Sequence, residues 1–196
     1  LERLIAGNQR FAHAQSALPK SITARRIETS KKQHPFAVVL GCSDSRVPPE
    51  MVFDQGLGDL FVVRTAGNVA SDDNIASIEY AVKHLGSTLI VVLGHERCGA
   101  VDAAVKDVQE SGRLPKLLRA IQPAVEQARK QKGDLLDNAI RQNVRDIVEK
   151  LETDEPILAK LVKAGKIRVI GAYYNLETGA VTFTLIPEQI AALKKR

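Results

Sequence analysis

Two runs of aliphatic and aromatic residues, each of strand length, constrain the fold more than any other feature. They lie at residues 36–40 and 89–93, and a glycine follows each of them. Such runs are typical of strands that are buried on both faces, as in a parallel sheet. In open α/β sheets the loops beyond the carboxyl ends of neighbouring strands converge on one crevice. The sequence therefore predicts an α/β fold in which the segments after these two runs meet.

The chain has two cysteines, and each lies in one of these two segments. Cys42 begins the sequence Cys-Ser-Asp-Ser-Arg, and Cys98 ends the sequence His-Glu-Arg-Cys, which starts at His95. Two thiolates and one imidazole are the three protein ligands of a catalytic zinc site, in which water or substrate takes the fourth position. We therefore expect one Zn²⁺ per chain, bound by Cys42, His95 and Cys98.

Other roles for the two cysteines agree less well with the sequence. Free cysteine is often an inert packing residue, but His95 stands three residues before Cys98, a spacing that suits a ligand loop. A redox dithiol is not favoured, because the chain has no C-x-x-C unit.

The combined motif Cys42-x-Asp44-x-Arg46 and His95-x-x-Cys98 resembles that of the β-class carbonic anhydrases. Three flanking segments, residues 58–64, 66–68 and 78–82, agree with this family in order and spacing. The active site resembles that of the plant-type members, whereas the chain as a whole has a bacterial appearance. A split motif with matching flanks is far more specific than an isolated C-x-D-x-R.

The resemblance implies one domain that comprises residues 1–196. Its expected fold class is α/β, with a mainly parallel central β-sheet, an antiparallel C-terminal edge strand, flanking helices and an N-terminal helical arm. The arm, residues 1–32, would pack on a partner subunit. A homodimer, or a homotetramer of paired dimers, is implied as well, with each active-site cleft at the dimer interface.

The resemblance also implies a reaction, the reversible hydration of carbon dioxide to bicarbonate and a proton. In this family zinc-bound hydroxide attacks carbon dioxide. Asp44 would accept a hydrogen bond from the hydroxide, while Arg46 keeps Asp44 ionised and oriented. In some members the aspartate binds zinc instead, so Asp44 is a candidate fourth ligand in a closed state.

Further residues are assigned to the substrate by the same resemblance. Gln33 would reach the site of the partner subunit and donate to the substrate, and the amide of Gly99 would bind an oxygen of the developing bicarbonate. The walls of the cleft would be formed by Phe61, Ala66 and Tyr80.

Three alternative functions remain open at this point. A hydrolase for carbon disulfide or carbonyl sulfide could use the same zinc and fold. A non-catalytic zinc protein would use Asp44 as a permanent fourth ligand, and a basic binding module would need no metal. The formal net charge of +5 could suit nucleic acid, but aromatic residues make up only 4% of the chain, which leaves little for base stacking. We therefore expect no nucleic-acid partner.

Length and hydropathy bound the remaining possibilities. A chain of 196 residues is long enough for one sizeable core and short for two domains. No apolar run approaches the ~20 residues that a membrane span requires. The expected compartment is the cytoplasm, or the periplasm if a leader was removed before Leu1.

The secondary structure is expected to alternate between helices and strands. Ser71 is a natural N-cap for one helix, and Gly86 would end it. Helices are predicted at residues 1–14, 21–32, 71–85, 99–109, 114–132, 134–151 and 156–164, and strands at residues 36–40, 60–64, 89–93, 167–172 and 181–186.

Overall fold

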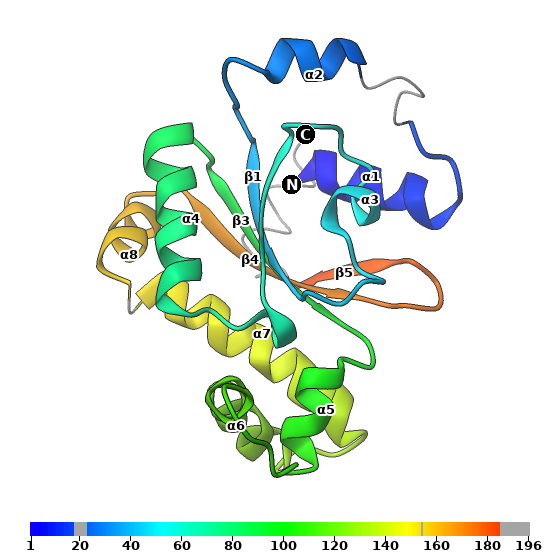
Figure 1. Cartoon of the computed structure of the whole chain (residues 1–196), viewed down its shortest axis with the longest axis vertical. Helices are drawn as coiled ribbons and strands as arrows, with labels where there is room; N and C mark the ends of the chain where they lie inside the picture. The colour runs from blue at the N-terminus through cyan, green and yellow to red at the C-terminus, as the bar shows by residue number, and fades with distance from the viewer. Residues whose placement is uncertain (18–22, 154, 185–196) are drawn as a thin grey trace.

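A five-stranded sheet with the order β2-β1-β3-β4-β5 forms the centre of the computed structural model (Figure 1). The structure describes residues 1–17, 23–153 and 155–184. The first four strands are parallel, and β5 pairs antiparallel with β4. The predicted fold class is thereby confirmed. The strands are β1 (Ala37–Gly41), β2 (Leu60–Arg64), β3 (Leu89–His95), β4 (Arg168–Tyr174) and β5 (Val181–Thr184).

Helices cover both faces of this sheet, which explains why β1 and β3 consist almost entirely of apolar residues. Every residue of these two strands is buried. Because side chains alternate between the faces of a strand, Val38 packs with the helices on one face and Val39 with those on the other. The helices are α1 (Glu2–Ala12), α2 (Thr23–Thr29), α3 (Pro49–Val52), the 3₁₀ turn η1 (Ala66–Asn68), α4 (Asp72–Leu85), α5 (Gly99–Val105), α6 (Leu114–Ala128), α7 (Leu135–Thr153) and α8 (Pro156–Lys163).

The two faces are covered by different parts of the chain. Helices α4, α7 and α8 supply the core of one face, and α1 and α3 supply that of the other, as Figure 1 shows. Helices α5 and α6 lie beyond the carboxyl ends of the strands, where α6 packs on α7. The segments that follow β1 and β3 therefore lie between the sheet and these two helices.

Several predicted boundaries need correction. Helix α3 was not expected; its proline Pro49 stands in the first turn, where a missing N–H costs no hydrogen bond. Helix α5 ends at Val105 instead of residue 109, and Asp107 beyond it has a left-handed backbone with φ 50°. Ser71 occupies the N-cap position of α4, but its side chain makes no capping bond within the described part of the chain.

Other boundaries agree with the prediction, differ from it by a few residues or cannot be compared. Gly86 ends α4 in the left-handed conformation, with φ 75°. Strand β3 extends to His95, two residues further than predicted. Residues 185 and 186 of the predicted last strand lie outside the described residues.

The two helices of the N-terminal arm differ in their contacts. Helix α1 packs on its own chain, because the Asn8 amide donates to the carbonyls of Val52 at 3.0 Å and Gly179 at 2.8 Å, and its oxygen accepts the N–H of Val181 at 2.8 Å. All seven residues of α2, each within the described part of the chain, keep exposed surface. Packing of the arm on a partner subunit stays a prediction.

Gly94, the residue before His95, allows α7 to approach β3 closely. A Cβ atom at Gly94 would lie 2.6 Å from Val144 Cγ2 and 3.3 Å from Ile140 Cγ2. We expect Gly94→Ala to lower the free energy of unfolding by about 1–3 kcal/mol, because the core must shift to admit the methyl group. Urea denaturation measures this change.

Gly41 provides a matched control, since it precedes Cys42 in the neighbouring strand. The nearest described atom to a Cβ there is Pro49 Cγ at 3.7 Å, an ordinary van der Waals distance. Equal losses of stability in Gly41→Ala and Gly94→Ala would show that the approach of α7 is not the cause.

Candidate metal centre

The carboxyl ends of β1 and β3 bring three metal-ligating side chains together. Cys42 follows β1, His95 ends β3, and Cys98 directly precedes α5. Because β1 and β3 are adjacent, with Gly41 opposite Leu93 in the register, the loops after them start side by side. The ligand atoms of Cys42, His95 and Cys98 all lie within 4.8 Å of one another, and the two sulfur atoms are 3.9 Å apart.

The ring of His95 is held in the form that a metal needs. Its Nδ1 lies 2.9 Å from the carbonyl oxygen of Glu96, which can only accept, so Nδ1 carries the hydrogen and Nε2 has a free lone pair. His95 is fully buried, and Nε2 has no hydrogen-bond partner among the residues that the structure describes. A buried acceptor without a partner is costly. A cation bound between Nε2 and the two sulfur atoms would remove this cost.

The thiol of Cys42 is also prepared to bind a cation, with the thiol of Cys98 beside it. Cys42 Sγ lies within hydrogen-bonding distance of Cys98 Sγ and accepts the backbone N–H groups of Asp44 at 3.4 Å and Gly67 at 3.3 Å. The hydrogen bond from Cys98 is the largest cause of the lowered pKa of Cys42, and the same bond raises the pKa of Cys98. A thiolate is the form of cysteine that binds metal, and the residues present therefore fit a zinc ion.

Asp44 and Arg46 form a bidentate ion pair beside the ligands. Arg46 Nε donates to Asp44 Oδ1 at 2.9 Å and Arg46 Nη2 to Asp44 Oδ2 at 2.7 Å, while the backbone N–H of Arg46 also donates to Oδ1 at 2.9 Å. These bonds from Arg46 hold the pKa of Asp44 well below its usual range. Asp44 Oδ2 also lies 3.8 Å from His95 Nε2. The carboxylate thus faces the same space as the metal-ligating atoms.

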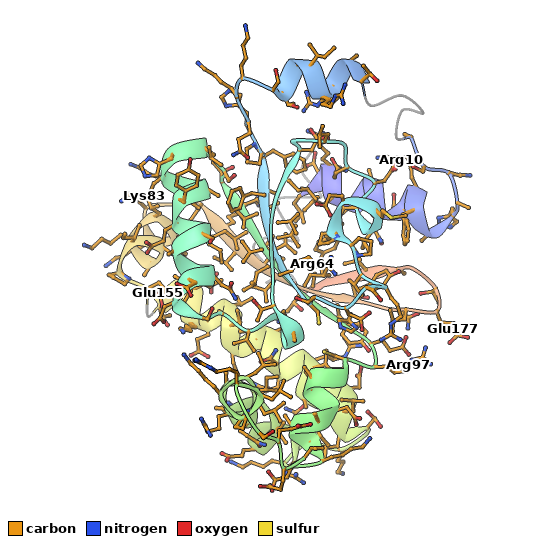
Figure 2. All side chains as sticks on the ribbon, viewed as in Figure 1. Arg10, Arg64, Lys83, Arg97, Glu155 and Glu177 are labelled. Atoms are coloured by element: carbon orange, nitrogen blue, oxygen red, sulfur yellow. The ribbon has the colours of Figure 1, made fainter. Side chains whose placement is uncertain are left out.

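Arg64, at the end of β2, supports this loop and received no role in the sequence analysis. Its Nε donates to the carbonyl of Cys42 at 2.8 Å and its Nη2 to the carbonyl of Asp44 at 2.6 Å. Figure 2 labels Arg64 near the centre of the view, where β1 and β2 run together. Arg64 reaches this loop because it stands opposite Gly41 in the β1–β2 register. A single sequence does not reveal that register.

Gly67 is a second supporting residue that the sequence analysis passed over. It has φ 66°, a left-handed conformation that suits glycine, and a Cβ there would lie 2.7 Å from Ile121 Cδ1. Its N–H donates to Cys42, as described above, and its carbonyl accepts the Asn143 amide of α7 at 2.9 Å. The adjacent Ala66 and the first residue of α5, Gly99, therefore border the ligand cluster.

Gln33, Phe61 and Tyr80 lie at the other end of the sheet from the ligands. Phe61 stands opposite Val38 near the start of β1, and its ring centroid is 6.4 Å from that of Tyr80. Gln33 and Tyr80 line one surface hollow of about 600 Å³. Val38, opposite Phe61, is four residues from Cys42, which is about 13 Å along a strand, and Gln33 precedes the start of β1. One chain therefore does not bring them to its own ligand cluster.

Comparison with known proteins agrees with this geometry. A family model described as carbonic anhydrase matches residues 37–181. The carbonic anhydrase of Mycolicibacterium smegmatis is 41% identical over 179 residues, which cover 89% of this chain and 87% of that protein. The chain belongs to the β-carbonic anhydrase family.

Other β-carbonic anhydrases are similar in sequence and in fold. Carbonic anhydrase 2 of Mycobacterium tuberculosis is 38% identical over 178 residues, covering 88% of this chain and 86% of that protein. The structure of the Coccomyxa β-carbonic anhydrase in complex with acetazolamide has a TM-score of 0.74 and 28% identity, covering 96% of this chain and 90% of that one. β-Carbonic anhydrases depend on zinc, and the Cys-His-Cys cluster fits that metal. In the described part of the chain no helix is long and apolar enough to cross a membrane.

Proposed function

We propose that the chain catalyses the reversible hydration of carbon dioxide to bicarbonate and a proton, with one zinc ion held by Cys42, His95 and Cys98. The observation that carries this proposal is the buried Nε2 of His95, which has no hydrogen-bond partner in the described part of the chain, in a cluster whose ligand atoms lie within 4.8 Å of one another. Zinc in such a site lowers the pKa of a bound water toward about 7 and so supplies a nucleophile at neutral pH.

Asp44 and Arg46 would orient the reacting water. An ionised carboxylate can only accept hydrogen bonds, so Asp44 accepts the O–H of the water and leaves an oxygen lone pair directed at carbon dioxide. Arg46 keeps Asp44 ionised through two side-chain bonds. Arg64 fixes the loop by donating to the backbone carbonyls of Cys42 and Asp44. Asp44 would also be available as a fourth ligand, since a carboxylate oxygen is an ordinary zinc ligand.

The substrate site would be completed by a second copy of the chain. Gln33 and Tyr80 line a hollow of their own, remote from the ligand cluster of the same chain, so they serve the reaction only if a partner subunit presents them. The exposed helix α2, whose Ile27 is 65% exposed, offers apolar surface for such a contact. The assembly would be a homodimer, or a homotetramer formed from two such dimers. Phe61, like Gln33 and Tyr80, would come from the partner subunit, and would line the cleft opposite Ala66 and the Gly99 amide beside the ligands.

A mixture of two inactive variants tests the shared site directly. Gln33→Ala lacks the donor, and Cys42→Ser lacks a ligand. In a mixed dimer one site combines an intact Gln33 with an intact Cys42, so random mixing should restore about a quarter of the wild-type activity per chain. Carbon dioxide hydration is measured after the two variants are unfolded and refolded together.

Two outcomes would contradict the shared site. Mixing that restores no activity would place Gln33 in its own chain's site. A monomer that stays fully active after dilution, with its mass measured by light scattering, would also exclude a site shared between subunits.

Metal content and substrate range test the proposed function itself. We expect one zinc per chain by atomic emission and carbon dioxide hydration that falls when the zinc is removed by a chelator. Hydrolysis of carbon disulfide or carbonyl sulfide without carbon dioxide hydration would instead identify the chain as a hydrolase on the same fold. Bound zinc with neither activity would identify it as a non-catalytic zinc protein.

A further inference from the structure

The loop of residues 95–98 carries two of the three proposed ligands, and Glu96 ties it to the neighbouring strand. The N–H of Glu96 donates to the carbonyl of Tyr174 at 2.9 Å, at the end of β4. Its carboxylate Oε2 accepts the N–H of Leu176 at 3.0 Å, in the turn between β4 and β5. The partners are 80 residues apart in the sequence. The backbone bond continues the sheet, whereas the second bond belongs to the Glu96 side chain alone.

The turn that receives Glu96 is itself well fixed. Asn175 Oδ1 accepts the N–H groups of Glu177 at 3.1 Å and Thr178 at 2.7 Å, and the Asn175 N–H donates to the carbonyl of Ala180 at 2.9 Å. Such a side-chain bond to the backbone two or three residues on is typical of Asn in turns. In Figure 2 the labelled side chain of Glu177 extends from this part of the molecule toward solvent, whereas Arg97 Nη2 donates to Glu96 Oε2 at 3.3 Å. The Glu96 carboxylate therefore holds the loop to a rigid support.

The same residue determines which nitrogen of His95 faces the metal site. The carbonyl of Glu96 accepts the Nδ1–H of His95 at 2.9 Å, and the peptide with this carbonyl continues into Arg97. Arg97 has φ 52°, a left-handed conformation that costs energy in any residue other than glycine. A loop with this strain keeps its shape only when surrounding contacts hold it, and the Glu96 side chain supplies one of them.

We propose that Glu96 is a positioning residue for the metal centre. Its carboxylate, bound to Leu176, fixes the peptide whose carbonyl holds the His95 ring and its Nδ1–H tautomer, so that Nε2 is directed at the metal. This inference rests on the proposed function in one respect, that zinc is the metal bound. Partners that orient a ligand in this way change metal affinity by about 10- to 100-fold.

Substitutions that separate the charge of Glu96 from its reach provide the test. Glu96→Gln keeps the length and an acceptor oxygen but loses the charge, whereas Glu96→Asp keeps the charge and is one methylene shorter. We expect Glu96→Gln to retain the wild-type zinc affinity. Glu96→Asp and Glu96→Ala should weaken it by about tenfold or more. Zinc affinity is measured on metal-free protein by competition with a chromophoric chelator, and the visible spectrum of the cobalt form reports the ligand geometry.

Glu177→Ala is the matched control. Glu177 is an exposed carboxylate in the same turn, and its removal should leave zinc affinity and the cobalt spectrum unchanged. If Glu96→Ala does not fold, as judged by circular dichroism, the comparison of Gln with Asp still decides the question.

Three results would overturn the proposal. One is a wild-type zinc affinity in Glu96→Asp or Glu96→Ala. The second is weak binding in Glu96→Gln with normal binding in Glu96→Asp, which would assign the effect to charge. The third is a lower melting temperature of metal-free Glu96→Asp with an unchanged cobalt spectrum, which would make Glu96 merely structural. A wild-type protein that binds no zinc would refute the proposed function instead, so the two failures are distinguishable.

Discussion

Cys42→Ser or His95→Ala should lose most of the bound zinc and essentially all carbon dioxide hydration. Each substitution removes one of three protein ligands, and the affinity of the remaining pair for zinc is far lower because the chelate is broken. In His95→Ala the buried Nε2, which has no partner among the described residues, disappears as well, and this gain in the metal-free protein opposes the cost of the cavity that the lost ring leaves. Atomic emission measures the zinc, and urea denaturation without metal measures the stability.

His13→Ala is a suitable control for the loss of an imidazole. His13 lies at the exposed end of α1, where its Nδ1 contacts the carbonyl of Gln9 at 2.7 Å. The His13→Ala protein should keep its full zinc content and activity. Full zinc occupancy in Cys42→Ser or in His95→Ala would remove that residue from the ligand set.

The ligand cluster could be predicted from sequence because its geometry follows from a general property of parallel sheets. Cys42 and His95 each stand at the carboxyl end of a buried apolar strand, and such ends converge. The Asp44–Arg46 pair is equally local, since Arg46 reaches Asp44 with its side chain and its own amide across two residues. Short-range patterns of this kind are contained in the sequence.

The supports of the cluster could not be predicted in the same way. The bond from Arg64 to the Cys42 carbonyl depends on the register of β1 and β2, and the bond from Glu96 to Leu176 joins positions 80 residues apart. Strand β3 was predicted to end at residue 93, because the apolar run ends there and Gly94 follows it. Pairing of His95 with Tyr174 extends the strand. Long-range pairing decides each of these features.

Arg46→Ala should leave zinc bound and lower activity by about 100-fold or more. Without the two side-chain bonds from Arg46, the Asp44 carboxylate is free to move from its position 3.8 Å from His95 Nε2 onto the metal, where an oxygen ligand is ordinary. The water that must react is then displaced, and removal of a group that orients a reacting atom typically costs factors of this size. Arg46→Lys keeps the charge but cannot donate in two parallel bonds, and its activity should be intermediate.

The pH dependence distinguishes two states of Asp44. Because Arg46 lowers the pKa of Asp44, the carboxylate stays ionised at every pH above its usual value of about 3.9, and a loss of activity between pH 8 and about pH 6 does not come from its protonation. Acidification instead protonates hydroxide, the competitor of Asp44 for zinc, and so favours the carboxylate-bound state. X-ray absorption of the zinc across this range should show that state appear at low pH in the wild type and at every pH in Arg46→Ala. A water-bearing site at every pH in both proteins would show that Asp44 acts only as the acceptor that orients the water.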